Sequence, residues 1–267
     1  MLRRHFLPML LAAAPGRALD RLASCFGDAH GTAILLHTAT RRPVGVHAPE
    51  LAGRLLVPPG STVKPFVIAA LLESGKLRPD DSYRCPGSLR IGGYNMACSH
   101  PPQLPPMQAR SAIAYSCNCF VARYATRFEP GELASVFSRC GLLSGTEGVP
   151  GELTRADVRL QSLGEAGIRV TPAALAMAYA RRTWTGPVLG GLADAVEFGT
   201  AQRAHVAGVR VAGKTGSVRA PDGMHVAWFV GFTAKYTVAV MLQGRSGGAD
   251  AAPVAGRILE AAHAGSW

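Results

Sequence analysis

Residues 57–74 read VPPGSTVKPFVIAALLES, and this stretch predicts a break in secondary structure followed by a helix. Pro58, Pro59 and Gly60 interrupt any preceding element. From Ser61 onward the apolar residues recur at helical spacing, which predicts a helix from Ser61 to about Ser74. Ser61 and Lys64 are three residues apart, so they share one face of this helix and the amine can reach the hydroxyl.

Ser61 and Lys64 form a candidate nucleophile and base. A serine hydroxyl is a poor nucleophile at neutral pH and needs a base beside it. The helix start also supplies free backbone N–H groups that stabilise a developing oxyanion. A lysine acts as a base only when neutral, and burial beside a second cation such as Lys214 would lower its pKa in that direction.

Two further motifs follow in order, Ser116-Cys117-Asn118 and Lys214-Thr215-Gly216-Ser217. The Asn118 amide can hold a peptide group by both donor and acceptor, and Ser116 can relay a proton to a leaving amine. A serine and an asparagine early in a predicted helix are also ordinary capping or solvated residues. The chain has only four lysines and two asparagines. The three motifs together hold two of the lysines, Lys64 and Lys214, and one of the asparagines, Asn118, which gives the motifs more weight.

The composition excludes a disordered chain and favours one globular unit. The 267 residues are 48% hydrophobic, enough for a sizeable core without disulfides or metals. A net charge of +11 suits a polyanionic partner, but the arginines are scattered without a basic run, so no nucleic-acid binding is expected. No apolar run reaches the length of about 20 residues that spans a bilayer, so no transmembrane anchor is expected.

The first residues have the order of an export signal. A charged segment that contains Arg3 and Arg4 precedes a short apolar stretch, residues 8–14, with small residues at its end. The Arg-Arg-x-Phe-Leu order resembles a twin-arginine signal. We therefore expect residues 1–25 to be an export signal or a flexible N-terminus, and the protein to be exported, periplasmic or extracytoplasmic.

The six cysteines show none of the repeated close pairs of a zinc ribbon, so neither a metal nor a cofactor is expected. Cys85 and Cys98 flank a short Gly- and Pro-rich stretch and are the first candidates for a disulfide. Buried free thiols are an equally good interpretation. Cys117 and Cys119, on either side of Asn118, are expected to be buried and inert.

Strand patterns at both ends and helix patterns between them predict an α/β (α+β) fold in which the termini share one sheet. The expected domain covers residues 26–267, with a sheet part at about 26–64 and 200–267 and a helical part at about 65–199. Residues 77–108, rich in Pro, Gly and Ser, are expected to be a long ordered loop. The remaining expected elements are two strands within 31–48, helices at 110–126, 131–139 and 172–182, strands at 206–213, 225–233 and 236–243, and a final helix at 252–263.

The order of the three motifs resembles the transpeptidase domain of penicillin-binding proteins and the related serine β-lactamases. The likeness covers about residues 28–263. It extends to Cys85-Pro86-Gly87 through Cys98 and His100, and to Ser162-Leu163-Gly164-Glu165, where Glu165 and Ala166 replace the family's Gln and Gly. The resemblance implies a five-stranded antiparallel sheet flanked by helices, with an all-helical subdomain inserted.

The resemblance also implies a role for each motif. Ser61 would be acylated with Lys64 as its base, and Ser116 and Asn118 would form the second wall of the cleft. Lys214 and Thr215, with Gly216 beside them, would bind the substrate carboxylate. The backbone N–H groups of Ser61 and Ser217 would form the oxyanion hole. The implied substrates are peptidoglycan stem peptides ending in D-Ala-D-Ala, with β-lactam antibiotics as their mimics.

Three functions fit these motifs. The first is a D,D-transpeptidase-like serine acyltransferase. The second is a D,D-carboxypeptidase or a slow β-lactamase, in which water deacylates the serine. The third is a β-lactam or muropeptide sensor, or a scaffold with cell-wall protein partners, which is acylated without turnover.

Overall fold

The computed structural model describes residues 21–142, 154–220 and 223–265. The expected export signal therefore lies almost entirely outside the described residues. Within the described ranges, no helix combines the length and the apolar character needed to cross a bilayer.

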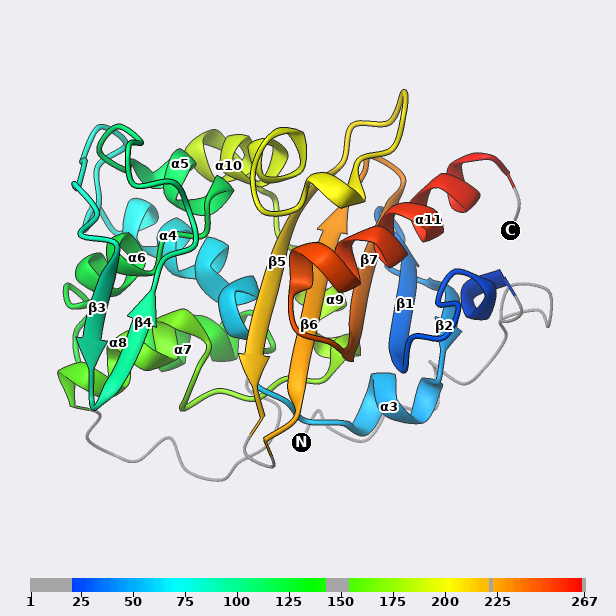
Figure 1. Ribbon diagram of the computed structural model, residues 1–267, viewed down its shortest axis with the longest axis horizontal. Helices are drawn as coiled ribbons and strands as arrows, with labels where there is room; N and C mark the ends of the chain where they lie inside the picture. The colour runs from blue at the N-terminus through cyan, green and yellow to red at the C-terminus, as the bar shows by residue number, and fades with distance from the viewer. Residues whose placement is uncertain (1–20, 143–153, 221–222, 266–267) are drawn as a thin grey trace.

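Five antiparallel strands form the central sheet (Figure 1). The strands are β1 (Gly31–His37), β2 (Pro43–His47), β5 (Ala212–Arg219), β6 (His225–Phe232) and β7 (Tyr236–Gln243), and their order is β2-β1-β7-β6-β5. Strand β1 pairs with β7 along its whole length, so the two ends of the chain share one sheet as predicted. Because β5 is the last strand, one of its edges is free of the sheet.

The two faces of the sheet are covered by different helices. Leu35, Phe229 and Val240 alternate onto one face, where α11 (Ala252–His263) packs on them after the single turn η3 (Gly247–Ala251). Ile34 and Trp228 lie on the opposite face, against α9 (Pro172–Arg181) and the rest of the helical part. Figure 1 shows α11 in front of the sheet and α9 behind it.

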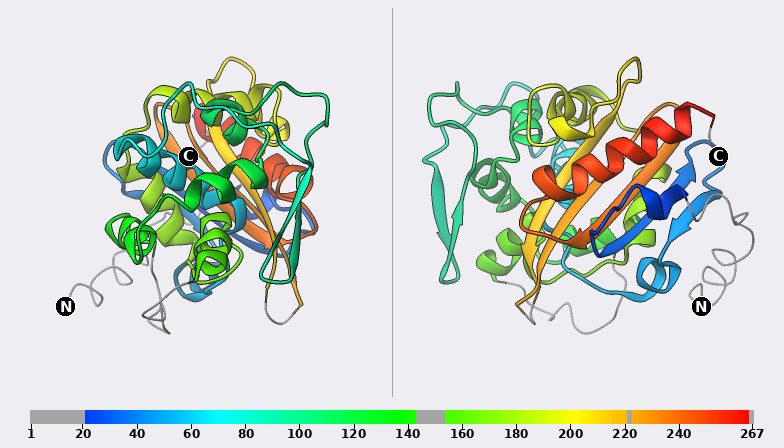
Figure 2. Two further views of the ribbon diagram at one scale, coloured as in Figure 1. Left: turned by 90° about the vertical axis from the view of Figure 1, so that its left-hand side faces the viewer. Right: turned by 45° about the vertical axis from the view of Figure 1, so that its right-hand side comes forward.

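The helical part lies beside the β5 edge (Figures 1 and 2). The helices over 131–139, 172–182 and 252–263 are confirmed as α7 (Glu132–Arg139), α9 and α11. The helices and helical turns that remain among the described residues are α3 (Pro49–Arg54), η1 (Gly60–Val63), α4 (Lys64–Glu73), α5 (Ala109–Ala114), α6 (Asn118–Ala125), α8 (Arg155–Leu163), α10 (Gly186–Glu197) and η2 (Gln202–Ala204).

The structure corrects several expectations of secondary structure. The segment 77–108 is not only loop, because β3 (Ser88–Ile91) and β4 (Tyr94–Ala97) form a hairpin, so the inserted part is not all-helical. Figure 2 shows this hairpin on the far side of the helical part from the sheet. The strand expected at 206–213 forms instead at Ala212–Arg219, which places the Lys214 motif inside the strand. The helix expected over 110–126 is broken into α5 and α6 at Ser116.

Of the two interpretations of Cys85 and Cys98, a disulfide or free thiols, the structure has the free thiols. Cys85 and Cys98 are free thiols, with their sulfur atoms 3.7 Å apart. The hairpin brings the two residues together, as their flanking positions suggested, but Cys98 also lies 3.9 Å from the sulfur of Cys117 and 3.6 Å from that of Cys119. Cys117 and Cys119 are buried, as expected.

Candidate active site

Ser61 lies in the tight turn η1 that leads directly into α4, and it is half-buried. Hydrogen bonds fix the chain on both sides of it. The Gly60 N–H donates to the carbonyl oxygen of Gly164 at 3.0 Å. The Tyr179 hydroxyl donates to the Thr62 carbonyl at 2.6 Å, and the Trp228 indole donates to the Pro58 carbonyl at 3.1 Å. The turn that carries the candidate nucleophile is therefore held by the sheet and by the helical part.

Lys64 begins α4 and is fully buried. Its amine donates to the carbonyl oxygen of Ser116 at 2.8 Å, to the Ser116 hydroxyl at 3.3 Å and to the Asn118 side-chain oxygen at 2.5 Å. Burial lowers the pKa of Lys64 to about 8, partly offset by nearby thiols and by Glu165. The lowered pKa makes the neutral amine, which is the form that acts as a base, easier to reach near neutral pH than in an ordinary lysine.

Ser116 is held in an uncommon backbone conformation. Its φ is +57°, in the left-handed region that non-glycine residues rarely adopt. The helix break here turns both the carbonyl and the hydroxyl of Ser116 toward Lys64. Cys117 then caps α6, because its sulfur accepts from the Phe120 N–H at 3.4 Å. Asn118 spans the site, since its side-chain N–H donates to the Ala97 carbonyl at 2.7 Å while its oxygen accepts from Lys64.

The third motif lies on β5, at the sheet edge nearest the turn. Lys214 is fully buried, and its amine donates to the Thr215 carbonyl at 3.0 Å. Burial and the charge of Lys64 hold the pKa of Lys214 well below its usual range. A Cβ on Gly216 would lie 2.9 Å from the Pro59 carbonyl oxygen, so glycine allows β5 to approach the Ser61 turn closely.

The backbones of Gly60 and Ser217 are also in contact. A Cβ placed on Gly60 would lie 3.5 Å from the Ser217 nitrogen. Ser217 is itself positioned through its hydroxyl, which accepts from the Gly247 N–H at 2.9 Å. The first and third motifs therefore approach each other at Gly60, the residue before Ser61, and at Ser217. Ser61 and Ser217 are the residues whose N–H groups were expected to form an oxyanion hole.

The structure brings together all three motifs from positions far apart in the chain, and it adds residues that the motifs did not include. Thr200 accepts a hydrogen bond from the Thr215 hydroxyl at 2.8 Å, and no pattern around Thr200 indicates this. Gly247 is equally hidden in the sequence. Glu165, which replaces the Gln of the resembled family, also belongs to a segment beside the site, and the three motifs did not indicate this.

Glu165 follows the glycine that packs on the Ser61 turn. The Val57 and Val170 backbones exchange hydrogen bonds of 3.1 and 3.0 Å, which fastens this segment to the residues before Ser61. Glu165 is half-buried. Burial raises the pKa of its carboxyl, while the charge of Lys64 lowers it. An acid that interacts electrostatically with Lys64 is therefore part of the site.

Comparison with solved structures identifies the fold. PBP2 of Pseudomonas aeruginosa, solved in complex with WCK 5153, superposes with a TM-score of 0.78 at 20% identity, covering 93% of this chain and 74% of that chain. A peptidoglycan glycosyltransferase from Burkholderia ambifaria gives 0.78 at 21%, covering 94% of both chains. The transpeptidase domain of penicillin-binding protein 3 from Burkholderia pseudomallei gives 0.77 at 21%, covering 93% and 92%. The fold is that of penicillin-binding protein transpeptidase domains.

Sequence comparison gives the family. Residues 55–184 and 188–260 match the model of the penicillin binding protein transpeptidase domain, and the chain belongs to this family. A probable peptidoglycan D,D-transpeptidase, PenA of Neisseria flavescens, is 29% identical over 144 residues. That match covers 50% of this chain and 35% of the relative.

Proposed function

We propose that the protein is a penicillin-binding serine acyltransferase that forms an acyl-enzyme with D-Ala-D-Ala stem peptides of peptidoglycan and with β-lactams. The observation that carries the proposal is the position of Lys64. It is buried, its pKa is lowered to about 8, and it stands one helical turn from Ser61 in contact with Ser116 and Asn118. A buried, readily neutralised amine beside a serine is what nucleophilic activation requires.

In the proposed reaction the Ser61 oxygen attacks the carbonyl carbon between the two D-Ala residues, and its proton passes to Lys64. The oxyanion that forms is stabilised by the N–H groups of Ser61 and Ser217. The C–N bond then breaks, and the leaving D-Ala amine takes the proton through Ser116. Lys214 and Thr215 hold the terminal carboxylate, and Asn118 holds the peptide amide. In transpeptidation an amine of a second stem peptide attacks the ester carbonyl and gives up a proton to Lys64. The C–O bond to Ser61 then breaks, and the Ser61 oxygen takes that proton.

The free edge of β5 supports an extended substrate. A strand edge offers N–H and C=O groups to which a peptide can add as a further strand. The Lys214 motif lies on this strand, beside the Ser61 turn. Family members act on peptidoglycan, so we place the site of action outside the cytoplasm.

Glu165 favours a second candidate function, hydrolysis by a D,D-carboxypeptidase or a slow β-lactamase. A half-buried carboxyl that interacts electrostatically with Lys64 can accept a proton from water attacking the ester. Incubation with a stem pentapeptide, with and without an acceptor amine, separates the two candidates. A cross-linked product indicates transpeptidation, whereas free D-Ala without cross-linking indicates hydrolysis.

Intact-mass measurement with a labelled penicillin tests the acyl-enzyme. We expect one adduct per chain, located at Ser61 by peptide mapping and absent from Ser61→Ala. Ser138→Ala, at an exposed serine of α7, is the control and should label as the wild type does. Absence of an adduct at Ser61 after hours of incubation would overturn the proposal.

A further inference from the structure

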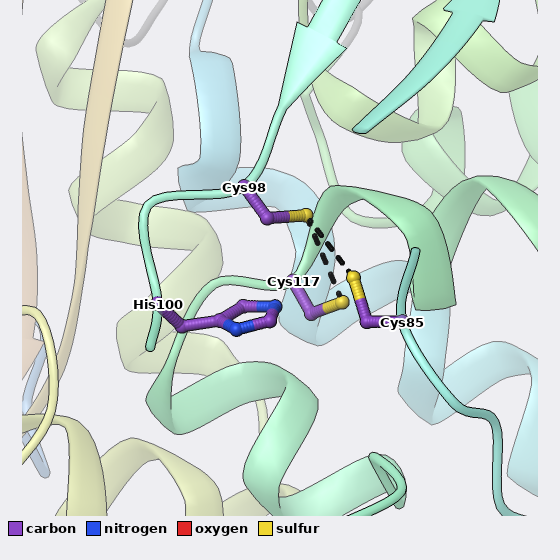
Figure 3. Close-up of side chains that lie close together, drawn as sticks. All are labelled: Cys85, Cys98, His100 and Cys117. Carbon is purple, nitrogen blue, oxygen red and sulfur yellow. Dashed lines mark hydrogen bonds between the residues drawn. The ribbon is translucent and has the colours of Figure 1, made fainter. Parts of the chain in front are cut away.

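Three thiols and an imidazole converge next to the active site (Figure 3). We call Cys85, Cys98, His100 and Cys117 the thiol–imidazole cluster. Cys85 precedes the β3–β4 hairpin, Cys98 and His100 follow it, and Cys117 lies at the start of α6. The hairpin therefore closes a loop that brings its two ends against the helix carrying Asn118.

The spacing of the donor atoms matches a tetrahedral metal site. All four lie within 4.8 Å of one another. The sulfur of Cys98 is 3.7 Å from that of Cys85 and 3.9 Å from that of Cys117. Tetrahedral zinc with Zn–S bonds of about 2.3 Å separates two ligand sulfurs by about 3.8 Å. The sulfurs thus already stand at the separation that a shared zinc ion imposes.

Contact between thiols alone can give similar sulfur separations, but it does not account for His100. The His100 Nδ1 atom lies 3.0 Å from the Pro101 carbonyl oxygen. A carbonyl can only accept, so Nδ1 carries the proton and Nε2 keeps a lone pair. Nε2 is buried and has no hydrogen-bond partner among the described residues. A buried nitrogen without a partner is costly, and a metal ion in the cluster would supply one.

The hydrogen bond to Pro101 is also the arrangement that metal-binding histidines use. Their second ring nitrogen usually donates to a carbonyl or a carboxylate, which fixes the tautomer and the direction of the ring. Sulfur and imidazole donors select zinc over magnesium or calcium, which prefer oxygen. A site with four protein ligands has no open position and is structural rather than catalytic.

We infer that the thiol–imidazole cluster binds one Zn²⁺ ion. The sequence did not predict this, because the spacings between the four residues lack the repeated close pairs of a zinc ribbon. Binding joins the zinc to three sulfurs and Nε2 and releases to solvent the protons that the ligand thiols carry. No oxidant or reductant is involved.

The zinc would fix the second motif of the active site. Cys117 lies between Ser116 and Asn118, the two residues that contact Lys64. Cys98 follows Ala97, whose carbonyl accepts from Asn118. Anchoring both cysteines would hold the strained Ser116 turn and the Asn118 side chain in their positions against Lys64. This consequence for acylation depends on the proposed function, whereas metal binding does not.

Metal binding is measured on the full chain, stripped with a chelator under reducing conditions and titrated with zinc alone. Native mass spectrometry should show one zinc per chain. Cobalt added in place of zinc should give the charge-transfer bands of thiolate-bound tetrahedral Co²⁺. These readouts do not use enzymatic activity, so failure of penicillin labelling leaves them interpretable.

Variants identify the ligands. Cys98→Ser and His100→Ala should each weaken zinc binding by at least about 10- to 100-fold. Cys140→Ser, at a half-buried cysteine outside the cluster, should bind zinc as the wild type does. If Cys98→Ser does not fold, the cobalt spectrum of the wild type and His100→Ala still decide the question.

Three results would overturn the inference. One is the absence of stoichiometric zinc in the reduced wild-type protein. Another is equal zinc binding by His100→Ala and Cys140→Ser. The third is a Cys85–Cys98 disulfide in protein isolated without reductant from the compartment in which it acts, since that bond removes two of the ligands.

Discussion

The amine of Lys64 lies 2.8 Å from the carbonyl oxygen of Ser116, a residue whose φ is +57°. The left-handed conformation costs a non-glycine residue about 1–3 kcal/mol unless its surroundings compensate. Here the compensation is the hydrogen bond to a buried amine, so the strained turn and the lysine depend on each other. The same turn sends the Ser116 hydroxyl toward the amine, which connects backbone strain with the proposed proton relay.

The pH dependence of acylation should follow the titration of Lys64. Only the neutral amine accepts the Ser61 proton, and burial lowers the pKa of Lys64 to about 8. The acylation rate should therefore rise with pH and level off above about 8, measured by stopped-flow with a chromogenic β-lactam. The ionisable groups that interact with the amine are Glu165, Lys214, Cys98, Cys117 and Cys119.

Lys64→Arg tests the origin of this pH profile. The guanidinium stays charged across the whole range, so the acylation rate should fall by about 10²- to 10⁴-fold and lose its rise toward pH 8. Lys235→Arg, at an exposed lysine after β6, should keep both the rate and the profile. A wild-type profile that is flat between pH 6 and about 9 would contradict lysine as the base.

Asn118→Asp should move the pH profile to higher pH. The Asn118 oxygen accepts from Lys64 at 2.5 Å, so a carboxylate there would stabilise the charged amine and raise the pKa of Lys64 by about one unit or more. At neutral pH the acylation rate should fall about tenfold or more, and it should partly recover at alkaline pH.

Asn95→Asp is the matched control, because Asn95 is an exposed residue of β4. It adds the same charge to the chain away from the amine and should leave the profile in place. An equal loss of rate at every pH in Asn118→Asp would show that Asn118 acts only through its contact with substrate.

Part of the fold, and most of the residues of the candidate site, could be predicted from the sequence. The strands within 31–48 and at 225–243 are short runs of apolar residues bounded by turn residues, a pattern typical of strands. The three motifs contain Ser116 and Asn118, which contact Lys64. The β5 boundary was missed because Lys214 and Thr215 are polar in the sequence, although packing buries them. The helix break at Ser116 is stabilised by a hydrogen bond from Lys64, which lies 52 residues earlier in the chain. The helix propensities of the residues near Ser116 therefore could not predict it.

The β3–β4 hairpin could have been predicted from the sequence, whereas the contact of Thr200 with Thr215 could not. Gly92 and Gly93 both have positive φ, so the Gly-Gly pair between Ile91 and Tyr94 was a readable hairpin signal. By contrast, nothing near Thr200 in the sequence indicates its contact with Thr215, because tertiary packing alone brings the two residues together.

Thr200→Val should weaken substrate binding by the third motif without abolishing it. The Thr215 hydroxyl donates to Thr200 at 2.8 Å, and this contact sets the direction of a side chain that we propose to bind the substrate carboxylate. Loss of one neutral hydrogen bond is worth about 0.5–1.5 kcal/mol, so kcat/KM for acylation should fall about 2- to 10-fold, mainly through KM.

A substrate analogue without the carboxylate separates positioning from stability. Thr200→Val should acylate with this analogue as fast as the wild type does. Thr40→Val, in the exposed turn after β1, is the control and should behave as the wild type with both substrates. An equal loss with both substrates would indicate a general structural effect of Thr200.

Gly164→Ala should disturb the nucleophile turn through a direct clash. Gly164 has a φ of +73°, and a Cβ there would lie 2.2 Å from the Gly60 carbonyl oxygen, next to Ser61. Gly93→Ala isolates the backbone cost, since Gly93 has a φ of +86° and nothing lies within 4 Å of its Cβ position. That cost is about 1–2 kcal/mol. By denaturant unfolding, Gly164→Ala should lose about 1–3 kcal/mol more than Gly93→Ala, and it alone should slow acylation. Equal losses of stability, with acylation preserved in both variants, would mean that the Gly164 segment can shift away without moving Ser61.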